Sequence, residues 1–95
     1  MTVYEDYANR FVEKNNLGPE HISVQFMCIV EELGEFAKAL SEGDKHDQAC
    51  ELADLLFTVF VMAELLSVDV LTSFIRKSEI NLTKSNRTSA GKIKK

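Results

Sequence analysis

The sequence predicts an all-α protein of four short helices, built around an antiparallel helical hairpin. Apolar residues recur at intervals of three and four along most of the chain, a pattern typical of helices packed on one face. No segment shows the sustained alternation of apolar and polar residues that half-buried strands require. The 95 residues include only one proline and four glycines, so a loop-rich protein is not expected. A chain of this length forms one domain.

The first helix is expected to begin directly after Thr2, because Thr2 and Glu5 fit a capping box. Apolar side chains then recur at helical spacing over residues 4–12. The segment NNLGP at 15–19 should end this helix, since glycine and proline interrupt helical hydrogen bonding.

The two central helices are expected over about residues 20–41 and about residues 47–66. The segment SEGD at 41–44 separates them. Because this connection is short, the two helices should be antiparallel neighbours.

A fourth helix is expected over about residues 70–87, with Asp69 as its N-cap. We expect the domain to comprise residues 1–87. Residues 88–95 are expected to form a basic, flexible tail, because they offer little apolar surface to bury.

Charge is distributed unevenly along the chain. Residues 1–75 carry 14 acidic and 4 basic side chains, whereas residues 76–95 carry 7 basic and 1 acidic. An acidic body with a basic end suits binding of a metal ion and phosphate, and it also suits a merely solvated tail.

The N-terminus lacks the features of a signal peptide, and the longest apolar stretch, residues 55–63, is too short to cross a bilayer. A cytoplasmic location without a membrane partner is therefore expected. Cys28 and Cys50 form no CxxC motif and are expected to be reduced thiols.

Pairs of carboxylates interrupt both central helices. Glu32 and Glu35 are three residues apart, as are Glu51 and Asp54, so each pair shares a helix face. Either pair alone is typical of a solvated surface, but if the two polar stripes flanking this tight turn face each other, four carboxylates converge. Converging carboxylates repel one another, and a divalent cation relieves that repulsion. Oxygen ligands favour Mg²⁺ or Mn²⁺ over Zn²⁺.

The acidic motifs resemble those of a known family. EELGE at 31–35 with ELAD at 51–54 matches the EExxE…ExxD pattern of the MazG-like all-α nucleoside triphosphate pyrophosphohydrolases. KSEINLTK at 77–84 is similar to the K-x-x-x-N-x-x-K/R segment of that family. The resemblance implies hydrolysis between the α- and β-phosphates of a nucleotide, with dNTPs or non-standard nucleotides as expected substrates, releasing a nucleoside monophosphate and pyrophosphate.

The resemblance also implies roles for individual residues. Mg²⁺, for which Mn²⁺ can substitute, would be held by Glu32, Glu35, Glu51 and Asp54. Glu31 would orient water beside the ion as a fifth catalytic acid. Lys77 and Asn81 would lie near the phosphates, with Lys84 one turn further on the same helix face. Family members form dimers or tetramers in which helices of two chains build each pocket, so a homodimer or homotetramer is expected.

Two residues at the start of the second helix are further candidates for substrate binding. His21 and Gln25 lie on the same helix stripe as the carboxylates, where they can reach the base or the sugar. His21 fits equally well as a helix-start residue without a role in binding.

Two other functions remain open. Phosphoribosyl-ATP pyrophosphohydrolase, an enzyme of histidine biosynthesis, has similar acidic motifs on a similar small helical chain. The spacing of Lys77, Asn81 and Lys84 fits the MazG-like pattern better and places this alternative second. The other alternative is a non-catalytic, dimeric helical module whose basic tail binds nucleic acid, although nucleic acid is not the expected partner. Ferritin-like di-iron chemistry is disfavoured, because neither His21 nor His46 follows a glutamate by three residues.

Overall fold

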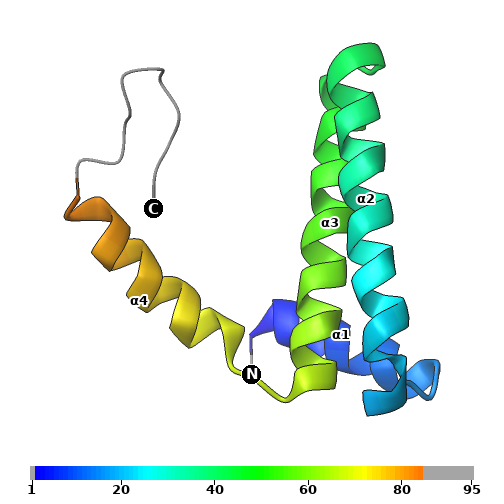
Figure 1. Cartoon of the computed structure of the whole chain (residues 1–95), viewed down its shortest axis with the longest axis vertical. Helices are drawn as coiled ribbons and strands as arrows, with labels where there is room; N and C mark the ends of the chain where they lie inside the picture. Colours follow the sequence, from blue (N-terminus) through cyan, green and yellow to red (C-terminus); the bar gives the residue numbers. More distant parts are fainter. Residues whose placement is uncertain (1, 85–95) are drawn as a thin grey trace.

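The computed structural model describes residues 2–84, which form four α-helices and one 3₁₀ turn (Figure 1). The elements in chain order are α1 (Val3–Lys14), η1 (Pro19–His21), α2 (Ile22–Glu42), α3 (Lys45–Leu66) and α4 (Val70–Leu82). No strand occurs in this described part of the chain, so the all-α prediction is confirmed there. The predicted tail and the end of the predicted fourth helix lie outside it.

The predicted starts of α1 and α4 are confirmed by their capping hydrogen bonds. At α1, the Glu5 N–H donates to Thr2 Oγ1 at 3.3 Å, and the Thr2 N–H donates to Glu5 Oε1 at 3.0 Å. At α4, the Thr72 N–H donates to Asp69 Oδ1 at 3.0 Å. α3 begins two residues earlier than expected, because Asp44 caps it. The Asp44 side chain accepts a hydrogen bond from the Asp47 N–H. Each cap satisfies a backbone donor that the helix itself leaves free.

The fourth helix ends at Leu82 rather than near residue 87. The Thr83 hydroxyl donates to the Ile80 carbonyl oxygen at 2.7 Å, and the Thr83 N–H donates to the same oxygen at 3.1 Å. A threonine side chain bonded back to the helix competes with its continuation, and the last turn tightens accordingly.

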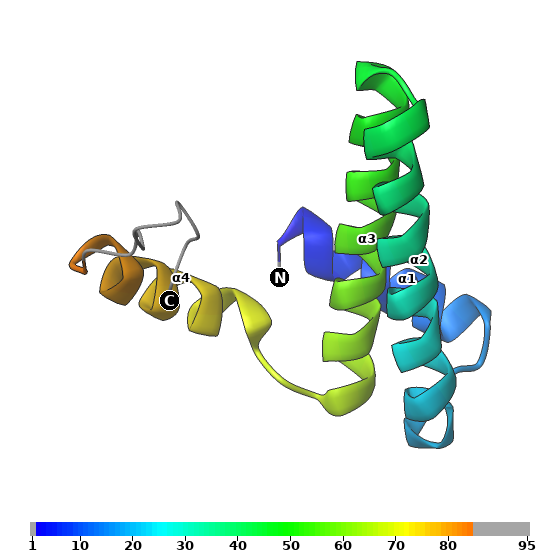
Figure 2. The same cartoon turned by 45° about the horizontal axis from the view of Figure 1, so that its top comes forward.

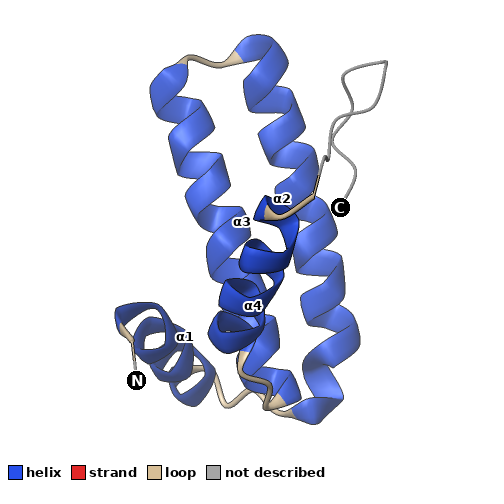
Figure 3. Ribbon diagram, turned by 90° about the vertical axis from the view of Figure 1, so that its left-hand side faces the viewer, coloured by secondary structure: helices blue, strands red, loops and turns tan. Residues whose placement is uncertain are grey.

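α2 and α3 form the expected antiparallel hairpin, and α1 crosses the lower part of α3 (Figures 1 and 3). The buried core lies where α1 meets α3 and contains Ala8, Phe60, Val61 and Leu65. Tyr4 stacks on Phe60 with 5.5 Å between ring centroids, which extends this core toward the start of α1. The core is therefore small and lies at one end of the hairpin.

α4 leaves the hairpin at a sharp angle. Ser67 adopts a left-handed backbone with φ of 56°, and the axes of α3 and α4 differ by 117°. Only the first turn of α4, at Val70 and Leu71, packs against the core, and the rest extends away from α2 and α3 (Figures 1 and 2). The radius of gyration is 15.5 Å, above the ~13 Å of a compact domain of about this length.

The hairpin leaves apolar side chains on its outside. On α2 an outer stripe at heptad spacing is exposed, consisting of Phe26, Val30, Leu33 and Leu40. Leu33, for example, is 55% exposed. On α3 the corresponding exposed residues are Leu52, Leu56 and Leu66. The described chain alone therefore leaves the predicted bundle unfinished.

No single helix within residues 2–84 has the length and apolar character needed to cross a membrane. Only α3 and α4 taken together meet these requirements, and this pair is sharply bent.

Candidate metal centre

Three carboxylates from the two central helices come together in the hairpin. Glu32 of α2 and Glu51 and Asp54 of α3 each offer an oxygen atom, and these atoms all lie within 4.8 Å of one another. Glu32 and Glu51 are half-buried between the helices, whereas Asp54 is exposed. We call these residues the three-carboxylate cluster. The antiparallel register thus brings together three of the four predicted ligands.

The pKa of Glu32 in the cluster is raised above the ordinary value of a glutamate carboxyl. Partial burial is the largest cause, followed by the negative charges of Asp54 and Glu51. Glu35 and Glu31 add smaller effects of the same sign. In the described part of the chain, no lysine or arginine forms an ion pair with these carboxylates. Their repulsion is therefore not relieved from within it.

The donor set suits a hard divalent cation. All three groups are carboxylates, and oxygen ligands are those that Mg²⁺ and Mn²⁺ prefer. The open, exposed side at Asp54 leaves room for water or a phosphate oxygen, as Mg²⁺ sites in phosphate-handling proteins require. The arrangement therefore suits a divalent metal ion.

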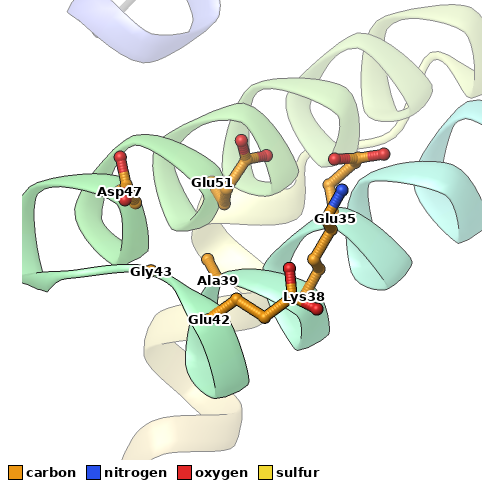
Figure 4. Close-up of a pocket in the computed structure, with 7 residues that line it drawn as sticks. All are labelled: Glu35, Lys38, Ala39, Glu42, Gly43, Asp47 and Glu51. Atoms are coloured by element: carbon orange, nitrogen blue, oxygen red, sulfur yellow. The ribbon is translucent and has the colours of Figure 1, made fainter.

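Glu35, the fourth predicted ligand, lies outside the group of three but close to it. Glu35 and Glu51 both line a pocket of ≈ 280 Å³ between the ends of α2 and α3. Figure 4 shows the two side chains projecting from facing helices into this region. The same pocket is lined by further residues that sequence reasoning did not single out: Lys38, Ala39, Glu42, Gly43 and Asp47. Glu31 is exposed, and its negative charge contributes to the raised pKa of Glu32.

The predicted phosphate-binding residues are not brought to the cluster within one chain. Lys77 and Asn81 lie on the outer half of α4, and Lys84 follows its end. This half of α4 points away from the α2–α3 hairpin (Figures 1 and 2). Both lysines are exposed, and Asn81 is half-buried.

His21 and Gln25 form hydrogen bonds within the protein. His21 Nδ1 accepts from the Gly18 N–H at 3.0 Å, which closes the η1 turn. Gln25 is only 7% exposed, and its Nε2 donates to the Thr58 carbonyl oxygen of α3 at 3.0 Å. Their contact with the substrate stays a prediction.

A second glutamine, Gln48, also joins α3 to α2, and this contact was not predicted from the sequence. Gln48 Nε2 of α3 donates to the Ala39 carbonyl oxygen of α2 at 3.3 Å. The signal for it was in the sequence, because residue 48 begins the three-and-four spacing that α3 uses against α2.

We expect Glu32→Gln to stabilise the metal-free protein at neutral pH. Because the pKa of Glu32 is higher in the folded than in the unfolded chain, folding loses stability as the pH rises through the folded-state pKa. The advantage of the amide should therefore be largest near neutral pH and should vanish below about 4.5, the ordinary pKa. Thermal melts in EDTA across this pH range measure the effect.

The control for this experiment is Glu13→Gln, which removes an exposed carboxylate of α1. The difference in melting temperature between Glu13→Gln and wild type should stay small across the whole pH range. If Glu32→Gln melted below wild type at neutral pH, the carboxylates would not repel one another as described.

The matched family model shows that the protein is a member of the MazG-like superfamily of all-α NTP pyrophosphatases, and the all-α fold and acidic hairpin agree with this class. A family model described as phosphoribosyl-ATP pyrophosphohydrolase matches residues 13–78. This match covers well over half of the chain, so the chain belongs to the phosphoribosyl-ATP pyrophosphohydrolase family. Neither the curated proteins nor the solved structures contain a significant match.

Proposed function

We propose that this protein hydrolyses phosphoribosyl-ATP between its α- and β-phosphates, with Mg²⁺ as cofactor, to phosphoribosyl-AMP and pyrophosphate. The observation that carries the proposal is the family match over residues 13–78, which spans every residue of the three-carboxylate cluster. The match favours this substrate over the dNTPs and non-standard nucleotides that the spacing of the third motif placed first.

Glu32, Glu51 and Asp54 would hold the ion, and Glu35 would join them from one turn along α2. Glu35 suits this role because it borders the same pocket as Glu51. When bound, Mg²⁺ neutralises phosphate charge and polarises the phosphoryl group that is attacked. Mn²⁺ has the same ligand preference and should substitute.

Glu31 is proposed to orient the attacking water and to accept its proton. This carboxylate is exposed and near enough to raise the pKa of Glu32 by its charge. The water oxygen forms a bond to the α-phosphorus, and the bond from that phosphorus to the bridging oxygen breaks. Pyrophosphate leaves with the bridging oxygen, and the proton passes to the carboxylate.

A second copy of the chain is proposed to complete the fold. A single antiparallel hairpin is half of a four-helix bundle, and each helix of such a bundle packs against two neighbours. The outer stripe of α2 and the exposed leucines of α3 remain about half exposed within residues 2–84. We therefore propose a homodimer, or a homotetramer of two such dimers.

The second copy would also complete the site. The outer half of α4, which carries Lys77 and Asn81, extends away from the hairpin of its own chain (Figure 2), and Lys84 follows the end of this helix. Placed beside the cluster of a partner, the two lysines would neutralise charge on the departing pyrophosphate. Asn81 would donate its amide to a phosphate oxygen.

Hydrolysis of dNTPs remains a second candidate, supported by one observation. Lys77, Asn81 and Lys84 follow the spacing of the MazG-like motif, and the family match ends at Ser78, before two of these three residues. Asn81 and Lys84 therefore lie outside the residues that the family match covers.

One assay separates these functions. Pyrophosphate release is measured for phosphoribosyl-ATP and for a panel of dNTPs, each with Mg²⁺ and with EDTA. We expect rapid, EDTA-sensitive turnover of phosphoribosyl-ATP only. Turnover of dNTPs alone would make the second candidate correct. Absence of all turnover, with salt-sensitive binding of nucleic acid, would support the non-catalytic module instead.

We retain a domain of residues 1–87 and a cytoplasmic location as parts of this proposal. Within the described residues, α1, η1 and α2 all contact α3, which supports a single domain built around the hairpin. The proposed substrate is a nucleotide of intermediary metabolism, which supports the location.

A further inference from the structure

The interface between α2 and α3 is a heptad seam that contains polar residues. Its members are spaced three and four residues apart on each helix, and all of them are buried or half-buried. They are Ile22, Gln25, Ile29, Glu32, Phe36 and Ala39 on α2, and Gln48, Glu51, Leu55, Thr58, Met62 and Leu65 on α3. Apolar side chains in such a seam tolerate small shifts of one helix along the other, whereas a buried polar residue with a hydrogen-bond partner specifies one alignment.

Two glutamines of the seam donate hydrogen bonds across it. Gln25 of α2 bonds the Thr58 carbonyl oxygen at 3.0 Å, and Gln48 of α3 bonds the Ala39 carbonyl oxygen at 3.3 Å. Within residues 2–84 these are the side-chain hydrogen bonds that join α2 to α3. Both acceptors are backbone oxygens, so the bonds depend on the positions of the helices rather than on the side chains opposite.

The two hydrogen bonds bracket the carboxylates. On α2, Glu32 lies between Gln25 and Ala39, and on α3, Glu51 lies between Gln48 and Thr58. Gln25 precedes Glu32 by seven residues, and Thr58 follows Glu51 by seven.

The Gln25–Thr58 bond therefore shares its antiparallel register with the Glu32–Glu51 contact, about 10 Å away along the hairpin. Any slip that separates the first pair separates the second. The carboxylates themselves repel and favour such a slip, whereas the glutamines oppose it.

We propose that Gln25 and Gln48 are positioning residues that fix the register of the hairpin and so keep the carboxylates at metal-binding distance. The inference rests on the proposed metal-dependent function. Neither glutamine touches the ion in this arrangement, and each acts through the helix opposite.

The test compares Gln25→Met with Ile29→Met. Both variants place the same flexible apolar side chain in the seam, but only the first removes a hydrogen bond across it. We expect Gln25→Met to weaken Mn²⁺ binding, followed by EPR, by about 10-fold or more, as loss of outer contacts to a metal site does. The KM for Mg²⁺ should rise by a similar factor, and the melting temperature should change little. Ile29→Met should bind Mn²⁺ as wild type does.

Gln48→Met is the second variant and should show the same separation of metal affinity from stability if Gln25→Met fails to fold. Wild-type Mn²⁺ affinity in either folded variant would overturn the inference, as would an equal loss in Ile29→Met. If the wild-type protein itself bound no Mn²⁺, the proposed function would fail together with this inference. Normal binding by wild type and variant alike would overturn the inference alone.

Discussion

Asp54→Asn should lower the rate of pyrophosphate release by at least about 100-fold, since even residues that only contact metal ligands contribute 10- to 100-fold. Asp54 supplies one of the three oxygen atoms that converge within 4.8 Å and is the member most open to an incoming phosphate. An amide oxygen is a weaker ligand for Mg²⁺ than a carboxylate oxygen. The substitution also removes one negative charge from the site. The helical fold should persist, because the exposed side chain takes no part in the core.

The matched control is Glu42→Gln, which removes an exposed acid from the pocket beside the cluster without touching the cluster. It should keep most of the activity. Steady-state assays over a range of Mg²⁺ concentrations, with circular dichroism of both variants, make the comparison. Wild-type turnover by a folded Asp54→Asn protein would remove the cluster from the mechanism.

Two inactive variants should restore activity when they are co-expressed. Asp54→Asn lacks a metal ligand, and Lys77→Ala lacks a phosphate-binding side chain on α4. If each site combines the hairpin of one chain with α4 of its partner, a mixed dimer contains one intact site and one doubly altered site. Random pairing makes about half of the dimers mixed, so the preparation should show about one quarter of wild-type activity.

The geometry behind this expectation is the direction of α4. Its outer half points away from the hairpin of its own chain, so the two altered positions cannot meet there (Figure 1). A site built within one chain would leave every molecule with one defect, and the mixture would be as inactive as its components. Co-expressed wild type with Lys77→Ala serves as the control for subunit mixing.

The sequence predicted the elements of the fold well because their signals are local. The two predicted caps, Thr2 and Asp69, accept hydrogen bonds from backbone N–H groups three positions away, whereas the cap at Asp44 was not predicted and α3 begins two residues early. The end of α4 was the larger error, since the back-bonded hydroxyl of Thr83 competes with helix propagation in a way that periodicity does not reveal.

For the site, spacing predicted which helix faces meet but not which side chains converge. Glu32 and Glu51 meet because both occupy the seam, whereas Glu35 lies one step off it and remains exposed. Gln25 shares the carboxylate stripe, but spacing did not reveal that its buried amide bonds the Thr58 carbonyl oxygen of α3. The direction of α4 depends on the left-handed Ser67, a conformation that no periodic pattern encodes.

The unfinished outside of the hairpin has a practical consequence for anyone handling the protein. If a second copy covers Leu33 and its neighbours, assembly obeys mass action, and the free energy of unfolding rises with protein concentration. Dilution to assay conditions would then lower melting temperature and specific activity together. Detergents and small apolar additives would compete for the same leucines and imitate the effect of dilution.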